Sequence, residues 1–237
     1  QVAFTNTSKN MNVPVEYRWD FGDNSSADTK HVQHLFNNTT SSDKTFDVNL
    51  TATSESQCVA DTSYPIEVFA FIDADFSLAD PAGCSPFTPV FTNASPAGAN
   101  RFFWDFGDGS SIDSSRVPNH TFINQTNDSL PLKRTIKLKV KNNHACYDSI
   151  TRTIDVYPEV TTNFSMISGG CTPLEVDFTN SSLISNQYFW KFGDNATSHV
   201  KNPTHTYYNH ETTNKTLTVE LISISAYGCK DSLEKPV

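Results

Sequence analysis

Apolar and polar residues alternate with a period of two along much of the chain. The pattern is clearest in three runs, at residues 46–50, 136–140 and 217–221. Successive side chains of a strand point to opposite faces, so each run predicts a strand with one face on a core and the other toward solvent. No window of the sequence shows a sustained helical period. The chain is therefore predicted to be all-β.

A second pattern is an aromatic phrase that occurs three times. It reads Tyr-Arg-Trp-Asp-Phe-Gly-Asp-Asn at residues 17–24 and returns in closely similar form at 102–109 and 188–195. Its first, third and fifth positions are aromatic in every copy. Because alternate residues of a strand share a face, the phrase predicts a core strand that buries three large rings. The central ring is Trp19, Trp104 or Trp190.

Other landmarks recur in a fixed order around this phrase. Phe-Thr-Asn precedes it at 4–6, 91–93 and 178–180, and a histidine with an aromatic residue two positions later follows it at 34, 120 and 205. A cysteine comes last in each copy, at 58, 146 and 229. Such repetition predicts three domains, which we place at residues 1–70, 71–157 and 158–237. Several short strands in each favour a two-sheet sandwich, with a small closed barrel as the alternative.

The end of the phrase has the residues of a tight turn. Glycine occupies one position in all three copies, and Asn or Gly follows two residues later, as expected where φ is positive. The aspartate between them is predicted to accept hydrogen bonds from turn amides. These turn residues are Gly22, Asp23, Gly107, Asp108, Gly193 and Asp194.

The competing interpretation of the turn is a calcium site. Its ligands would be the acid pairs Asp20/Asp23 and Asp105/Asp108, since oxygen-rich loops bind calcium. However, the third copy has Lys191 where the others have an aspartate. A shared metal site would not place a cation there, so we expect no metal and no cofactor.

The recurring histidine could instead indicate catalysis. The sequence contains neither the Gly-x-Ser-x-Gly phrase of a hydrolase nucleophile nor the His-Glu-x-x-His phrase of a metalloprotease. The histidine stands at a fixed offset from a core aromatic residue in each repeat. We therefore expect it to make a local hydrogen bond near the start of a strand, and we expect no enzyme activity.

Charge and hydropathy exclude two classes of partner. The net charge is −9, and no basic cluster was found in the sequence that reverses this sign locally. Such a chain repels nucleic acid and anionic membrane surfaces. No apolar run approaches the roughly 20 residues of a membrane helix. We expect no nucleic acid as partner and no membrane insertion.

The repeated phrase resembles the polycystic-kidney-disease (PKD) domain. The resemblance rests on Trp-Asp-Phe-Gly-Asp-Gly-Ser at 104–110, on Pro-x-His-x-aromatic at 118–122, and on the long alternating strand that follows. It covers essentially the whole chain, and Lys191 is its main departure. The resemblance implies tandem Ig-like β-sandwiches of the kind found in extracellular adhesins, surface-layer proteins and accessory domains of secreted hydrolases. Cysteine-containing arrays of this type resemble giant surface adhesins of gliding bacteria.

The cysteines follow the repeat. Cys84 and Cys171 both stand seven residues before the phenylalanine of Phe-Thr-Asn, so a complete repeat has an early and a late cysteine. We predict disulfides within each repeat, Cys84–Cys146 and Cys171–Cys229, with Cys58 unpaired. By the same alignment the first domain is truncated at its N-terminus and the last strand of the third is clipped. Disulfides indicate an oxidising compartment.

Two functions remain open from the sequence. Short linkers without Gly/Ser runs, at 69–72 and 157–160, predict an extended array. This favours an extracellular, cell-surface spacer or adhesive segment whose partners are neighbouring repeats and a polysaccharide or surface protein. The alternative is a carbohydrate- or protein-binding accessory module of a secreted hydrolase. Phe103 and Phe189, expected on the outer face, are its candidates for stacking on sugars, unless they cover a neighbouring strand. Arg18 takes their place in the first copy.

Overall fold

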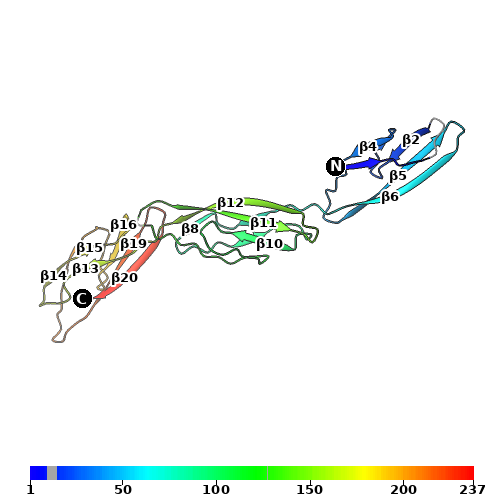
Figure 1. Cartoon of the computed structure of the whole chain (residues 1–237). Helices are drawn as coiled ribbons and strands as arrows, with labels where there is room; N and C mark the ends of the chain where they lie inside the picture. The colour runs from blue at the N-terminus through cyan, green and yellow to red at the C-terminus, as the bar shows by residue number, and fades with distance from the viewer. Residues whose placement is uncertain (10–14, 127) are drawn as a thin grey trace.

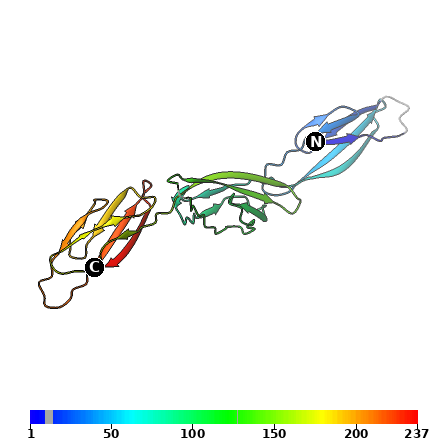
Figure 2. The ribbon, with the colours of Figure 1, turned by 60° about the vertical axis from the view of Figure 1, so that its left-hand side comes forward.

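The structure is a computed structural model that describes residues 1–9, 15–126 and 128–237. These residues form strands and connecting loops, and no helix among them is long and apolar enough to cross a membrane. Figure 1 shows the strands gathered into three domains that follow one another along an extended molecule. The view in Figure 2, turned by 60°, shows the same linear arrangement.

The first domain pairs a four-stranded sheet, in the order β3-β2-β5-β6, with the two-stranded sheet β1-β4. Its strands are β1 (Val2–Thr5), β2 (Val15–Asp20), β3 (Ser26–Ala27), β4 (His31–His34), β5 (Lys44–Ser54) and β6 (Val59–Val68).

The second domain has the same three central strands, as β10-β11-β12, but its fourth strand is β8, beside β12, and its second sheet is β7-β9. Its strands are β7 (Phe76–Leu78), β8 (Ala82–Cys84), β9 (Phe91–Asn93), β10 (Arg101–Asp105), β11 (Leu132–Lys141) and β12 (Tyr147–Tyr157). Strand β8 lies parallel to the end of β12, which brings Cys84 beside Tyr157.

The third domain has the sheet β17-β16-β19-β20 and two short pairs, β14-β18 and β13-β15. Its strands are β13 (Phe164–Ser165), β14 (Leu174–Asp177), β15 (Thr179–Asn180), β16 (Gln187–Lys191), β17 (Thr197–Ser198), β18 (Thr204–Tyr207), β19 (Thr218–Ile224) and β20 (Lys230–Pro236).

The register of the central strands is the same in all three domains. Each motif tryptophan lies opposite the central leucine of the alternating strand, and the pairs are Trp19↔Leu50, Trp104↔Leu138 and Trp190↔Leu221. Both side chains of each pair point into the domain, because residues opposite each other in a ladder share a face. The period-two runs are thus strands that supply one wall of a sandwich, as predicted.

Three separate hydrophobic cores correspond to the three domains. Trp104 and Trp190 are completely buried, and each packs edge-on against the phenylalanine of the domain's first strand, Phe76 or Phe164, with ring centroids 5.0 Å apart. In the first domain Trp19 packs on Phe4 at 5.4 Å. Aromatic rings contribute much of the apolar area buried in such small cores.

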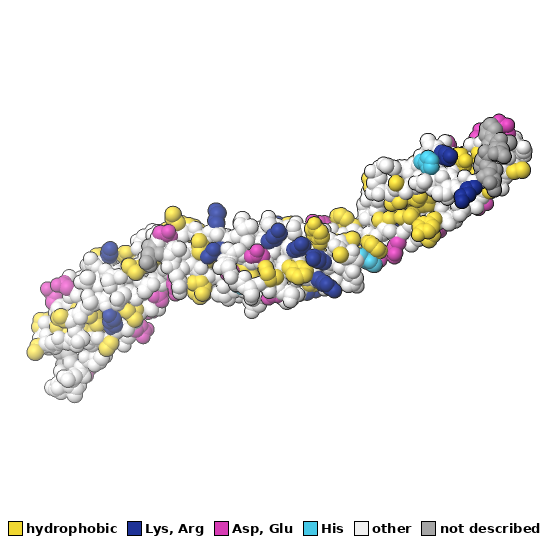
Figure 3. All heavy atoms as spheres, in the orientation of Figure 1, with side chains coloured by type: hydrophobic (Ala, Val, Ile, Leu, Met, Phe, Trp, Pro, Cys, Tyr) yellow, Lys and Arg dark blue, Asp and Glu magenta, His cyan; other side chains and the backbone are white. Residues whose placement is uncertain are grey.

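The outer face of β11 carries a basic row that the sequence analysis did not identify. Lys133, Lys137, Lys139 and Lys141 alternate with buried or partly buried residues along this strand. Figure 3 shows Lys and Arg side chains gathered on the middle domain. Part of this charge is neutralised locally, since the Lys133 ammonium lies 2.9 Å from Asp155.

The structure contradicts the predicted disulfides. Cys84 is bonded to Cys229 of the third domain, with Cα atoms 5.6 Å apart, and Cys58, Cys146 and Cys171 are free among the described residues. The reason is the length of β12. Cys84 pairs with the last residue of this strand, while Cys146 precedes its first residue. Eleven residues of strand span about 35 Å, whereas a disulfide requires Cα atoms within about 7 Å.

Candidate functional site

The turn after the motif strand has the same backbone conformation in each domain. The glycines have positive φ, as does the Asn or Gly two residues later. At Gly107 the φ is 69°, and a Cβ atom would lie only 2.4 Å from the carbonyl oxygen of Thr135 on β11. Glycine is therefore required there both by its conformation and by the close approach of the alternating strand.

The aspartate of the turn binds a histidine from across the sandwich. In the second domain Asp108 Oδ1 accepts hydrogen bonds from the Ser110 amide at 3.0 Å and hydroxyl at 2.6 Å, and Oδ2 lies 2.7 Å from Nε2 of His120. The His120 ring stacks on Phe106 with centroids 3.9 Å apart. We call such a pair an Asp–His clasp.

Equivalent clasps occur in the other two domains. Asp23 lies 2.7 Å from His34, and Asp194 lies 2.8 Å from His205. Each histidine stacks on the last aromatic residue of the phrase, Phe21 or Phe192. The recurring histidine thus makes a hydrogen bond, as expected, but the bond is not local: its partner lies 11 or 12 residues upstream, across the sandwich. His34 also ends β4 rather than beginning a strand.

The clasps hold their aspartates in the charged form. Burial alone would raise the pKa of Asp108, but the hydrogen bonds from Ser110 and His120 outweigh it and lower the pKa to about 2. The Ser25 hydroxyl is the main cause of the lowered pKa of Asp23. Burial also acts to raise the pKa of Asp194, and bonds from His205 and the Ala196 amide overcome it.

The two acids of the phrase in the first and second domains point to different partners. Asp105 Oδ1 accepts the Gly107 amide at 3.0 Å, whereas Asp108 is engaged by Ser110 and His120. Within residues 1–9, 15–126 and 128–237, no group of three or more His, Cys, Asp or Glu side chains is placed to hold a metal ion. In the third domain the Lys191 ammonium lies 2.7 Å from Glu220 on the adjacent strand, which explains its departure from aspartate.

The two sugar-stacking candidates are partly covered by their own neighbours. Phe103 and Phe189 are half-buried rather than exposed. The Lys141 ammonium lies 5.6 Å from the centre of the Phe103 ring, and the His199 ring stacks on Phe189 at 4.9 Å. Arg18, in the same position of the first domain, faces Asp28 at 3.5 Å. The domains therefore do not form a uniform aromatic platform.

The junction between the first two domains is a stacked ring pair with a histidine–aspartate contact beside it. Phe69, just after β6, stacks on His144 from the turn between β11 and β12, with centroids 3.7 Å apart. His144 Nε2 lies 3.1 Å from Asp43 Oδ2, and Asp43 Oδ1 accepts the Ala70 amide at 2.7 Å. His144 of the second domain thus contacts both the linker and a loop of the first domain.

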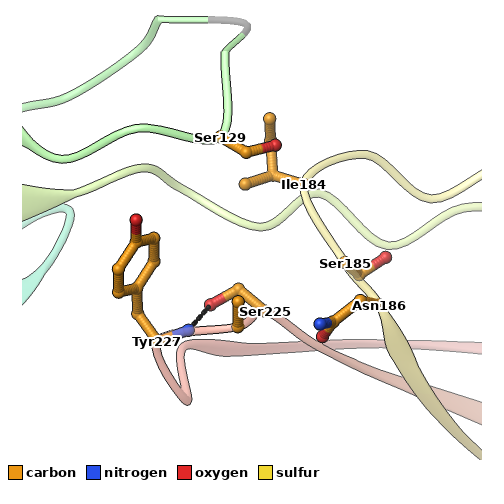
Figure 4. A pocket seen from close by; sticks show the side chains of 7 residues that line it. Ser129, Ile184, Ser185, Asn186, Ser225 and Tyr227 are labelled. Carbon is orange, nitrogen blue, oxygen red and sulfur yellow. Dashed lines mark hydrogen bonds between the residues drawn. The ribbon is translucent and has the colours of Figure 1, made fainter.

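The junction between the second and third domains has a stack in the same position and a disulfide beside it. Tyr157, at the end of β12, stacks on Tyr227 with centroids 4.5 Å apart, and the Cys84–Cys229 bond joins the two domains. A shallow groove of about 200 Å³ lies here, with Ser129 from one domain and Ile184 to Asn186 from the other along its walls (Figure 4). The Tyr227 amide, also on its lining, donates to Ser225 Oγ at 3.3 Å.

Two sets of junction residues were missed in the sequence analysis. The side-chain amides of Asn38 and Asn124 each donate at 2.8 Å to the carbonyl oxygen near the end of the last strand, that of Val68 or Val156. Both stand four residues after the recurring histidine, so the repeat held a signal for them. Asp148 and Asp231, two residues after a late cysteine, accept the linker amides of Ala74 at 2.8 Å and Thr162 at 2.7 Å.

Comparison with protein-family models gives a match to the PKD domain over residues 1–68 and 155–235, which is more than half of the chain. The chain belongs to the PKD domain family. The second PKD repeat lies between the matched regions and shares their register and clasp. No sequence among curated proteins matches the chain.

Solved structures with similar folds include single and tandem domains. The PKD1 domain of Epp from Vibrio anguillarum is 23% identical, with 33% of this chain and 90% of that chain covered and a TM-score of 0.28. Domains EC22–24 of mouse cadherin-23 are 10% identical over 98% of this chain and 88% of that chain, with a TM-score of 0.39. A tetra-tandem repeat from the extending region of a large adhesion protein is 10% identical over 94% of this chain and 66% of that chain, with a TM-score of 0.30.

Proposed function

We propose that this chain is a non-enzymatic, extracellular spacer and adhesive segment of a large repetitive cell-surface protein. It holds a binding region away from the surface and bears load along its length. The domains that we propose span residues 1–70, 71–157 and 158–237. The junction rings Phe69 and Tyr157 lie at the ends of the first and second of these ranges. The partners are neighbouring repeats and a polysaccharide or surface protein.

The observation that carries this proposal is the disulfide across a domain junction. Cys84 and Cys229 are 145 residues apart in sequence, so their bond closes a loop that contains most of the second and third domains. Tension applied at the two ends of the chain passes through this bond and bypasses the loop. Unfolding inside the loop therefore cannot lengthen the molecule. Disulfides persist in oxidising compartments, which supports an extracellular location.

Shape supports the same proposal. The three domains lie in a line (Figure 1), and each junction is fixed by a ring stack and by hydrogen bonds to the linker. A row of sandwiches joined in this way increases reach with each domain. A spacer needs reach and stiffness, and it needs no catalytic group.

Single-molecule stretching tests the load-bearing role. The chain is pulled from its two termini until every domain has unfolded, with and without a reducing agent. An extended residue spans about 3.6 Å, so reduction should release about 520 Å of additional length from the 145-residue loop. The Cys58→Ser variant is the matched control and should behave like the parent chain. Equal lengths under oxidising and reducing conditions would contradict the proposal.

The accessory-module alternative has weaker support. It depends on Phe103 and Phe189, whose outer faces are partly occupied by Lys141 and His199. If the alternative holds, soluble polysaccharides should bind over these rings, and the Phe103→Ala and Phe189→Ala variants should lose that binding in affinity electrophoresis while their domains remain folded.

A further inference from the structure

The five cysteines of the chain fall into two structural classes. We call Cys84 and Cys171 early cysteines, because each lies seven residues before the Phe-Thr-Asn strand of its repeat and begins a Cys-x-Pro sequence. We call Cys58, Cys146 and Cys229 late cysteines, because each lies just before the last strand of its domain. In this structure the early cysteine of the second domain is bonded to the late cysteine of the third.

The late cysteines are held by one and the same turn. The carbonyl oxygens of Cys58, Cys146 and Cys229 accept a backbone amide four residues upstream, at 2.9, 3.1 and 2.8 Å. Their own amides donate to the side chain of that upstream residue, which is Ser54, Asn142 or Ser225. The residue before each cysteine has a positive φ. The turn that presents Cys229 to its partner is therefore already formed around the two free late cysteines.

The junctions place these turns equivalently. His144 and Tyr227 each stand two residues before a late cysteine, and each stacks on the ring that ends the preceding domain, Phe69 or Tyr157. In the second domain the early cysteine lies directly beside that final ring, because Cys84 pairs with Tyr157. At the first junction, Cys146 thus takes the position that Cys229 takes at the second.

We propose that arrays of this repeat are cross-linked by a disulfide relay, in which the early cysteine of each repeat bonds to the late cysteine of the next. Cys84–Cys229 is one complete link of the relay. In such an array the early cysteine Cys171 would bond to the late cysteine of the repeat that follows it. The late cysteines Cys146 and Cys58 would each bond to the early cysteine of the repeat that precedes their own. Each link forms by exchange with a small-molecule disulfide, which accepts two electrons and two protons from the thiol pair and leaves as two thiols.

The relay has a mechanical consequence that disulfides within a repeat lack. A bond from one repeat to the next spans the linker between them, so each junction has a covalent path beside the backbone. A bond within a repeat leaves every linker as a single strand of backbone. The relay follows from the cysteine geometry alone and does not depend on what the array binds.

A tandem of two complete chains tests the relay. Residue 237 aligns with 154, and residue 1 aligns with 175, so a copy of residues 155–174 is the natural connector between the two chains. The connector supplies the end of one domain, the linker, and an early cysteine for the first domain of the second chain. After oxidation with oxidised glutathione, disulfides are mapped by mass spectrometry of non-reduced peptides.

The relay predicts two new links besides Cys84–Cys229 in each chain. Cys171 of the first chain should bond to Cys58 of the second chain, and the connector's copy of Cys171 should bond to Cys146 of the second chain. Two matched variants identify which chain is involved: Cys58→Ser in the second chain should free one additional thiol, whereas Cys58→Ser in the first chain should leave the links unchanged. A bond from the connector's cysteine to Cys58 of its own repeat, thiols that stay free, or mixed pairings would overturn the relay.

A cleavage assay gives an independent readout. A protease site placed in the connector is cut under native conditions, and the products are separated without reductant. The relay predicts that the halves stay together until a reducing agent is added. Halves that separate without reductant would overturn it.

Discussion

At the first junction Phe69 stacks on His144, and at the second Tyr157 stacks on Tyr227 in the equivalent place. The two junctions differ in what reinforces the stack. The first has a contact between His144 Nε2 and the Asp43 carboxylate, whereas the second has the Cys84–Cys229 disulfide. The ring stack and the hydrogen-bonded linker are therefore the common device that orients neighbouring domains, and the disulfide is a separate device that limits how far they can come apart.

Removing the disulfide should have the largest effect. The chain-entropy relation gives about 5 kcal/mol for closing a loop of 145 residues, so the Cys84→Ser/Cys229→Ser double variant should lose up to about that much stability in its second and third domains. Denaturant unfolding followed by tryptophan fluorescence measures the loss. Cys58→Ser, which removes an exposed free thiol, is the control. Identical unfolding midpoints for the double variant and the control would mean that the disulfide does not stabilise the second junction.

Disrupting the middle domain should loosen both junctions together. Trp104 is completely buried, so Trp104→Ala should destabilise the second domain by about 3–5 kcal/mol. Phe103 is half-buried on the outer face, so Phe103→Ala should destabilise the second domain less, by about 1 kcal/mol. Thermal melts of the two variants give the comparison. The opposite ranking would mean that the inner and outer faces of β10 are assigned wrongly.

Acid should weaken the domains without breaking the disulfide. The folded pKa of Asp108 is about 2 and its ordinary value is 3.8, so its contribution is complete above about pH 4 and is lost as the pH falls toward 2. The shift corresponds to at most about 2 kcal/mol for the second domain. Unfolding experiments from pH 5 to pH 2 measure it, with Asp108→Asn as the matched variant. If the variant kept the acid sensitivity of the parent chain, the clasp would not be its source.

Removing one ring of a junction stack should have the smallest effect on stability. Its effect on flexibility should differ between the two junctions. A stacked pair contributes about 0.5–1.5 kcal/mol. His144→Ala also removes the contact with Asp43, so it should loosen the first junction, whereas Tyr227→Ala should change the second little while the disulfide is intact. Small-angle scattering detects the added flexibility as a shorter maximum dimension. His210→Ala, in an exposed loop, is the control. Equal loosening by both junction variants would mean that the disulfide adds no restraint.

The sequence predicted the interior of each domain better than its ends. The period-two runs and the aromatic phrase identified the central strands, and Gly107 was expected to have a positive φ because no other residue type occupies its position. The disulfide partner could not be predicted, because the spacing of cysteines along a repeat does not reveal which end of a long strand each occupies. The junction stack was also hidden, since His144 and Tyr227 are different residue types with one structural role.

The most direct test of this account is the pairing of Cys84. The oxidised chain is digested without reduction after its free thiols have been alkylated, and the linked peptides are identified by mass spectrometry. One linked pair is expected, Cys84 with Cys229, together with alkylated Cys58, Cys146 and Cys171. Linked pairs Cys84–Cys146 and Cys171–Cys229 would contradict it, because every junction would then be joined by the backbone alone.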